Sequence, residues 1–128
     1  MNAGFARGAR IRAFLLAIAV AALFSNPNLA ADGKGKGIRF WNLTSSTITN
    51  LQLSPAGRNA WGPNQCANDP DGTVDHDERL RITGIAAGRY DAKLANKAGR
   101  SCIVRNLDIQ EDGIFSIEDK DLKECGKD

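Results

Sequence analysis

The sequence predicts an all-β fold: a small antiparallel sandwich or partly open barrel of about six strands, preceded by a signal peptide. From Ile38 onwards, short stretches of apolar and β-branched residues alternate with polar residues and are separated by turn-forming Gly, Asn and Asp. No window in this region places apolar residues at sustained helical spacing. At 128 residues the chain has room for one such domain, which we assign to residues 38–128.

The first 31 residues have the three zones of a secretory signal peptide. Arginines near the N-terminus precede an apolar run over residues 13–24, and small residues then lead to Ala30 and Ala31. As a helix the apolar run would span about 18 Å, which is short of the membrane's hydrocarbon core of about 30 Å. We therefore predict cleavage after Ala30 or Ala31, a periplasmic or secreted product and no stable membrane span. An uncleaved N-terminal anchor is the alternative.

The charge balance excludes one class of partner. The chain contains 17 Lys and Arg and 15 Asp and Glu, for a formal net charge of +2. Three of the arginines lie in the signal peptide, so the mature chain has a net charge of about −1. Nucleic-acid affinity is built from many contacts between basic side chains and phosphates. A near-neutral chain therefore predicts no nucleic-acid partner.

The strands follow a flexible Gly- and Lys-rich lead-in over residues 32–37. In the first strand, Phe40 and Trp41 fall on opposite faces. In the third, Leu80 and Ile82 point inward and the arginines beside them point to water. We expect strands over six stretches: Ile38–Leu43, Thr47–Ser54, Glu78–Thr83, Arg89–Asn96, Cys102–Ile109 and Ile114–Glu118.

The fourth strand has the clearest alternation, because Tyr90, Ala92 and Leu94 share one face and charged residues share the other. Turn chemistry over residues 96–100 predicts a hairpin between the fourth and fifth strands. Residues 111–113 predict another between the fifth and sixth. The expected core consists of Phe40, Leu51, Leu53, Leu80, Ile82, Tyr90, Ala92, Leu94, Ile103, Leu107, Ile109, Phe115 and Ile117.

Three cysteines, Cys66, Cys102 and Cys125, allow one disulfide in an oxidising compartment. If the last hairpin turns near Glu111, Cys102 faces Asp121 and Cys125 is a short reach beyond it. We therefore predict a bond between Cys102 and Cys125, with Cys66 to Cys125 as the second choice. The chain has no CxxC and a single histidine, which does not suit a zinc site.

An acidic stretch over residues 67–78 partly matches a twelve-position calcium loop. Asp69, Asp71, Asp75 and Glu78 take positions at which calcium ligands occur. However, Ala67 takes the first position, where the pattern requires aspartate, and the flanks are not helical. The favoured interpretation is a solvated loop and turn that binds no cofactor. Calcium binding through the four acidic residues is the alternative.

Catalysis has little support in the sequence. His76, the sole histidine, lies among carboxylates with no nucleophile motif beside it, so we predict no catalytic residues and no enzyme. Two tryptophans are candidates for partner binding, because tryptophan is enriched in interface hot spots. Trp41 is on a strand, and Trp61 is in a loop bounded by glycine and proline. Either can instead cap the edge of a small core.

Four segments carry a family resemblance: Phe40–Thr44, Leu53–Gly57, Trp61–Asn64 and Gly88–Asp91. Their aromatic-x-Asn, Ser-Pro, Trp-Gly and Gly-x-Tyr-Asp motifs resemble a family of small exported bacterial proteins of uncharacterised function. The resemblance implies a compact all-β exported fold with no assigned activity and no catalytic residues. In that family a short Pro-Gly turn stands where this chain has residues 75–77, which favours the turn over the calcium loop.

Together these features predict a non-enzymatic exported β-domain, a structural or binding module for an unknown protein or small ligand. The expected contact surface is the loop face that carries Trp61 and the acidic stretch. A calcium-binding domain that uses residues 67–78 is the first alternative, and an enzyme of unknown chemistry is the second.

Overall fold

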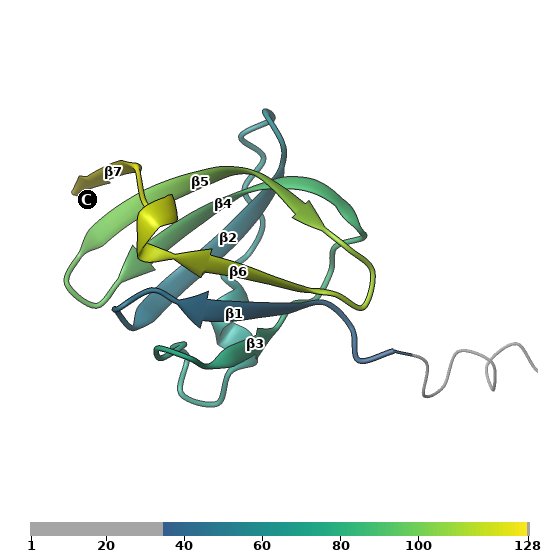
Figure 1. Cartoon of the computed structure of the whole chain (residues 1–128), viewed down its shortest axis with the longest axis horizontal. Coiled ribbons are helices and arrows are strands. Elements are labelled where there is room, and N and C mark those ends of the chain that lie inside the picture. The colour runs from purple at the N-terminus through teal and green to yellow at the C-terminus, as the bar shows by residue number, and fades with distance from the viewer. Residues whose placement is uncertain (1–34, 128) are drawn as a thin grey trace, which may run out of the picture. The chain divides into compact units, whose positions relative to one another are not determined.

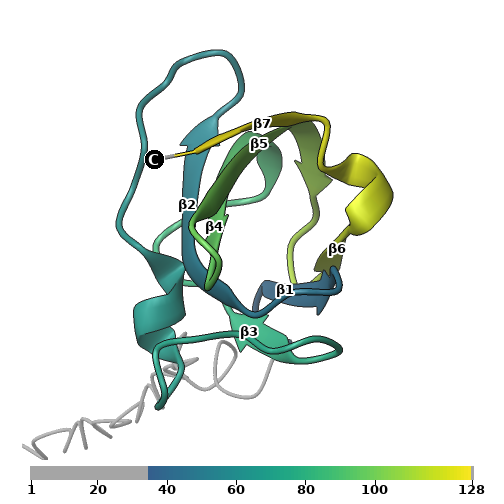
Figure 2. The ribbon, with the colours of Figure 1, turned by 90° about the vertical axis from the view of Figure 1, so that its left-hand side faces the viewer.

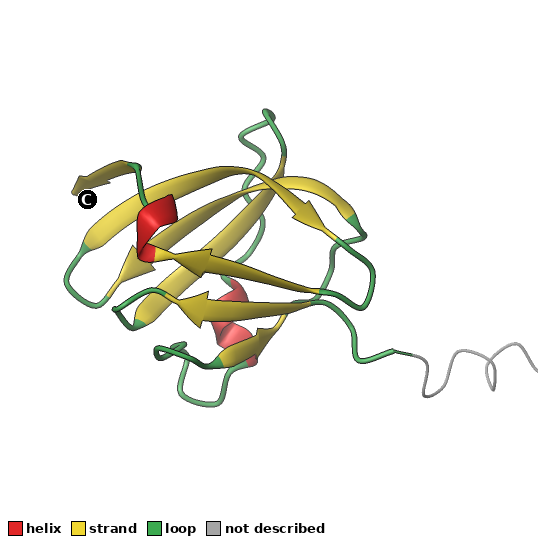
Figure 3. Cartoon of the chain, viewed as in Figure 1, coloured by secondary structure: helices red, strands yellow, loops and turns green. Residues whose placement is uncertain are grey.

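The computed structural model describes residues 35–127, so the predicted signal peptide over residues 1–31 lies outside the described part. The described residues form seven strands and two 3-10 helices, which confirms the all-β class (Figures 1 and 3). No helix in this part is long and apolar enough to cross a membrane. In chain order the elements are β1 (Arg39–Leu43), β2 (Ile48–Pro55), η1 (Gln65–Asn68), β3 (Arg79–Arg81), β4 (Gly88–Asn96), β5 (Arg100–Ile109), β6 (Ile114–Glu118), η2 (Asp119–Asp121) and β7 (Glu124–Lys127).

The strands form two sheets that pack as a sandwich (Figure 2). The larger sheet has the order β2-β4-β5-β7 and is antiparallel throughout. The smaller has the order β3-β1-β6, in which β1 pairs antiparallel with β3 and parallel with β6. The predicted sandwich is therefore confirmed, with one parallel pair and a seventh strand that were not expected.

The hydrophobic core brings together inward-facing residues from both sheets. Phe40 of β1 and Phe115 of β6 are cross-strand partners whose ring centroids lie 5.4 Å apart. Burial of such side chains is the main source of stability in a small domain. The buried apolar residues are Ile38, Phe40, Ile48, Leu51, Leu53, Cys66, Val74, Leu80, Ile82, Ala92, Leu94, Cys102, Val104, Ile109, Phe115 and Ile117.

The predicted hairpin between the fifth and sixth strands is wrong, because β6 pairs with β1 in the other sheet. The turn after β5 is fastened to the start of β1 instead. Asp112 accepts a hydrogen bond from the Gly37 N–H at 3.0 Å, and the Gly113 carbonyl accepts one from the Arg39 N–H at 3.0 Å. These contacts direct β6 along β1.

The prediction that Ile103 lies in the core is also wrong. Cys102 and Val104 point inward, whereas Ile103 lies opposite Lys93 on the outer face. Strict alternation fails in β5 because the register with β4 shifts by one residue near Asn106, whose φ of 62° is left-handed. Ile109, beyond this bulge, again points inward.

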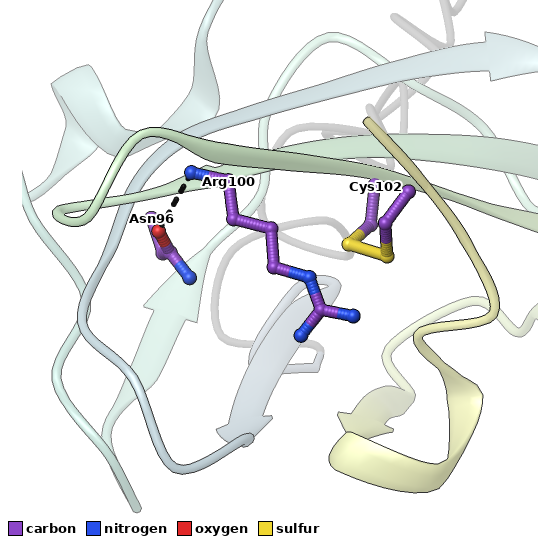
Figure 4. The surroundings of a disulfide bond; sticks show 4 residues. Asn96, Arg100 and Cys102 are labelled. Carbon is purple, nitrogen blue, oxygen red and sulfur yellow. Dashed lines mark hydrogen bonds between the residues drawn. A yellow bond between two sulfur atoms is a disulfide. The ribbon is translucent and has the colours of Figure 1, made fainter. Parts of the chain in front are cut away.

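The predicted disulfide between Cys102 and Cys125 is confirmed (Figure 4). The two cysteines are direct cross-strand partners in β5 and β7. The expected reason was wrong, since β7 rather than β6 runs beside β5. Cys66 is buried and free.

Candidate functional site

The four predicted calcium ligands lie in the loop between η1 and β3. Asp69 accepts a hydrogen bond from the Asp71 N–H at 2.8 Å, and Glu78 accepts one from the Asp75 N–H at 2.7 Å. Asp75 in turn accepts one from the Thr47 hydroxyl at 2.9 Å. Within residues 35–127, no three His, Cys, Asp or Glu side chains are grouped so that they could hold a metal ion. The carboxylates of Asp69 and Glu78 therefore stabilise the loop's own turns, and that of Asp75 ties the loop to Thr47.

Negative charge nevertheless gathers around Glu78. The hydrogen bond from Asp75 lowers the pKa of Glu78, but partial burial and the carboxylates of Asp69 and Asp75 raise it, and the net shift is upward. Burial, followed by the charges of Asp69 and Glu78, raises the pKa of the Cys66 thiol to about 11. This thiol stays protonated at neutral pH and is a poor nucleophile.

Calcium should have little effect on the stability of the domain. Because Ala67 removes the first ligand, we expect an affinity of about 10⁻⁴–10⁻³ M or weaker. At about 1 mM calcium, a site with a Kd of about 1 mM adds only about 0.4 kcal/mol to the free energy of unfolding. Thermal melts in calcium and in chelator should therefore nearly coincide. A rise of many degrees that Asp71→Ala or Glu78→Ala abolishes would contradict this and support the calcium-binding alternative.

His76 is exposed, and its Nδ1 lies 2.7 Å from the backbone carbonyl oxygen of Thr44. No Ser, Thr or Cys side chain in residues 35–127 is hydrogen-bonded to the imidazole. The contact fastens the turn over residues 75–77 to the loop that follows β1. It gives no support to a catalytic role, and the absence of enzymatic activity stays a prediction.

Trp61, the predicted partner-binding residue, lies half-buried in the loop between β2 and η1. The Lys93 ammonium lies 5.4 Å from the centroid of the Trp61 ring. The adjacent Gly62 is tied to the edge of β2, because its N–H donates to the Leu53 carbonyl at 2.9 Å. The loop thus lies along the β2 edge of the larger sheet, and Trp61 contacts Lys93 of β4. Partner binding by Trp61 stays a prediction.

An apolar groove of about 330 Å³ lies between the loop after β2 and the loop before β4. Its glutamine, Gln65, is already engaged: the amide donates to the Thr83 carbonyl at 2.9 Å and accepts from the Thr83 N–H at 3.0 Å. The Tyr90 hydroxyl donates to the Ala86 carbonyl at 2.8 Å. These contacts leave few free polar groups to orient a ligand in the groove.

Basic and apolar side chains gather on the outer face of the β3-β1-β6 sheet, whose strands lie side by side in Figure 1. Strand pairing sets Arg81, Arg39 and Ile114 in one row and Arg79 beside Trp41 in the next. The residues that alternate with them, such as Phe40, Leu80 and Phe115, point into the core. We call Arg39, Trp41, Arg79, Arg81 and Ile114 the cationic face.

Within residues 35–127, no ion pair joins an acidic side chain to any of the three arginines of the cationic face. The ion pairs among residues 35–127 involve Arg105 and Lys120 instead. Arg39 and Arg81 are direct cross-strand partners, an arrangement that is destabilising for like charges. The Nε atom of Arg39 is also buried without a hydrogen-bond partner. Three arginine charges are therefore gathered on this face without forming ion pairs.

Trp41 and Arg79 form an ordered pair within the cationic face. The guanidinium carbon of Arg79 lies 4.2 Å from the centroid of the Trp41 ring, within the range of a cation–π contact. The Trp41 indole N–H donates to the Asp77 carboxylate at 2.9 Å, which fixes the orientation of the ring. These contacts hold both side chains in place before any ligand arrives.

The alternation in β1 and β3 predicts that Trp41, Arg79 and Arg81 each point outward. It does not predict that β1 and β3 are neighbours in the sheet, since β2 and η1 lie between them in the sequence. The sequence pattern therefore did not predict that these residues form one surface. Two outward arginines in a strand of three residues are the signal that could have drawn attention to it.

Comparison with protein-family models, with curated proteins and with solved structures finds no match to this chain. The resemblance to a family of small exported bacterial proteins therefore stays a prediction.

Proposed function

We propose that the protein is a non-enzymatic exported binding domain that holds an anionic ligand on its cationic face. The observation that carries the proposal is the group of three arginines that form no ion pair with any described residue. The planar guanidinium group matches phosphate and carboxylate groups, often through two parallel hydrogen bonds. The proposed ligand therefore displays phosphate or carboxylate groups.

Such a face is costly to the folded protein when no ligand is bound. Arg39 and Arg81 repel each other across β1 and β3, and the buried Nε of Arg39 has lost its hydration without gaining a partner. An anion between the two guanidinium groups would relieve the repulsion between them. Features that reduce stability in this way are expected at functional sites.

The near-neutral net charge does not oppose this proposal. Acidic residues lie mostly in the loop over residues 67–78 and around η2, and of these Asp77 contacts the cationic face through the Trp41 indole. At physiological ionic strength charges are screened over about 8 Å, so a ligand on the cationic face responds mainly to the nearby arginines. The anionic character of the ligand follows from this local charge.

Replacing the three arginines with glutamine, R39Q/R79Q/R81Q, should weaken binding of inorganic polyphosphate or polygalacturonate about 10- to 100-fold. Each exposed charge pair contributes up to about 1 kcal/mol, and three are lost together. Titration calorimetry measures the affinities, and binding by the unmodified protein should weaken as salt rises.

The matched control is R58Q/R89Q/R100Q, which removes the same charge from three exposed arginines outside the cationic face. This variant should bind the two polyanions like the unmodified protein. Equal weakening in both variants would mean that only net charge matters. That result, or no binding by the unmodified protein, would refute the proposed site.

A further inference from the structure

We infer that the anionic ligand is the surface of a membrane rich in anionic lipid. The inference rests on the proposed function and extends it by naming the kind of partner. It starts from Ile114, which lies on the cationic face directly beside Arg39. Ile114 is 45% exposed, and it is the one large apolar residue among residues 35–127 that is largely open to solvent.

The chemistry of the cationic face combines charge with apolar surface. Trp41 and Leu43 are half-buried on the same side of β1 as Arg39. A soluble polyanion offers an exposed isoleucine no favourable contact. At a membrane, the guanidinium groups meet lipid headgroups while indole and aliphatic side chains enter the interfacial region.

The geometry allows these side chains to reach one plane together. Neighbouring strands lie about 4.8 Å apart, and outward residues along one strand are about 6.7 Å apart. The five residues of the cationic face therefore project from a patch about 10 Å across. All five belong to paired strands rather than loops, which fixes their relative positions.

Acidic groups lie at both ends of the cationic face. Asp77 lies near Trp41 and accepts its indole hydrogen bond, and Glu118 pairs with Lys120 at 2.9 Å. Both acids lie at the Leu43 end of the sheet, and Asp112 lies at the other end, where it accepts a hydrogen bond from the Gly37 N–H at 3.0 Å. The three arginines lie between these acids, so this part of the face should meet the anionic surface.

Sedimentation with vesicles tests the inference. The full-length mature protein should bind vesicles of phosphatidylcholine with about 30% phosphatidylglycerol, and not vesicles of phosphatidylcholine alone. Each basic residue near an anionic leaflet contributes about fivefold, so R39Q/R79Q/R81Q should weaken binding about 100-fold. Ile114→Thr should weaken it about fivefold, because less apolar surface enters the interface.

Two further variants sharpen the test. Ser116 is exposed beside Trp41 on the same face, so Ser116→Ile should strengthen binding to anionic vesicles about fivefold. Ile103→Thr removes an isoleucine from the outer face of the other sheet and should leave vesicle binding unchanged. Neither Ile114→Thr nor Ser116→Ile should alter the affinity for soluble polyphosphate.

The outcomes separate the two proposals. Binding of polyphosphate without binding of anionic vesicles would overturn the membrane inference and leave the proposed function standing, with a soluble anionic polymer as ligand. The membrane inference would also be overturned if Ile114→Thr and Ser116→Ile left the affinity for anionic vesicles unchanged. If the protein binds neither polyphosphate nor anionic vesicles, both proposals are overturned.

Discussion

Loss of the bond between Cys102 and Cys125 should lower the melting temperature by about 12–24 °C. The two cysteines are 23 residues apart, and closing a loop of that length restricts the unfolded chain by about 3 kcal/mol. In a domain of this size, each 1 kcal/mol corresponds to about 4–8 °C. Among the described strands β7 pairs with β5 alone, and the disulfide adds a covalent link to that pairing.

Calorimetry of the unmodified protein with and without dithiothreitol, beside C102A/C125A, measures this effect. The reductant should lower the melting temperature of the unmodified protein and leave that of the double variant unchanged. The double variant thereby controls for Cys66, which stays free in both proteins. Equal melting temperatures with and without reductant would show that the disulfide does not stabilise the fold.

The six strands expected from the sequence all exist because the signal for a strand is local. Alternation between core-facing and solvent-facing residues identifies β4 from its own residues, without reference to any partner. β7 was not predicted, because Glu124–Lys127 contains one apolar residue, Cys125, and shows no alternation of apolar and polar residues. That strand depends on the disulfide and on its pairing with β5.

Pairing between strands could not be predicted in the same way. Residues 110–113 have ordinary hairpin chemistry, yet Asp112 binds Gly37, which is 75 positions away. A contact at that distance decides that β6 joins β1, and no local pattern encodes it. Likewise, the left-handed Asn106 reverses the alternation in β5, and only the contacts of β5 with β4 explain why.

The candidate site shows the same division between local and non-local information. The acidic loop was found because its pattern is continuous in sequence, but the structure uses Asp69 and Glu78 in turns and Asp75 in a contact with Thr47. The cationic face joins residues from three strands that are far apart in the chain. The near-zero net charge of the chain gave no sign of the cationic face, because net charge does not show where the charged residues lie.

Replacing Asp91 with asparagine should reduce the free energy of unfolding by about 2–3 kcal/mol near neutral pH. Asp91 is 2% exposed and accepts hydrogen bonds from the N–H groups of Gly57 and Asn106, both at 2.9 Å. Arg105 adds a third contact at 3.3 Å. The amide of asparagine turns an N–H group toward one of these donors and leaves it without an acceptor. The bulge at Asn106 and the loop after β2 both depend on this carboxylate.

The effect should depend on pH. Burial alone would raise the pKa of Asp91, but the hydrogen bonds from Gly57 and Asn106 and the charge of Arg105 hold it below its ordinary value. A carboxyl whose pKa is lower in the folded state stabilises the protein above its unfolded pKa of about 4, and this stabilisation is lost as pH falls further. The gap between the unmodified protein and Asp91→Asn should therefore narrow below about pH 4.

Urea unfolding from about pH 7 to about pH 2 measures that gap, with Asp108→Asn as the matched control. Asp108 is exposed on β5, and its carboxylate accepts a hydrogen bond from the Gln110 side chain. Its replacement should change stability by no more than about 0.5 kcal/mol at any pH. A constant gap for Asp91→Asn across the whole range would show that the carboxylate's charge does not hold the bulge and the loop together.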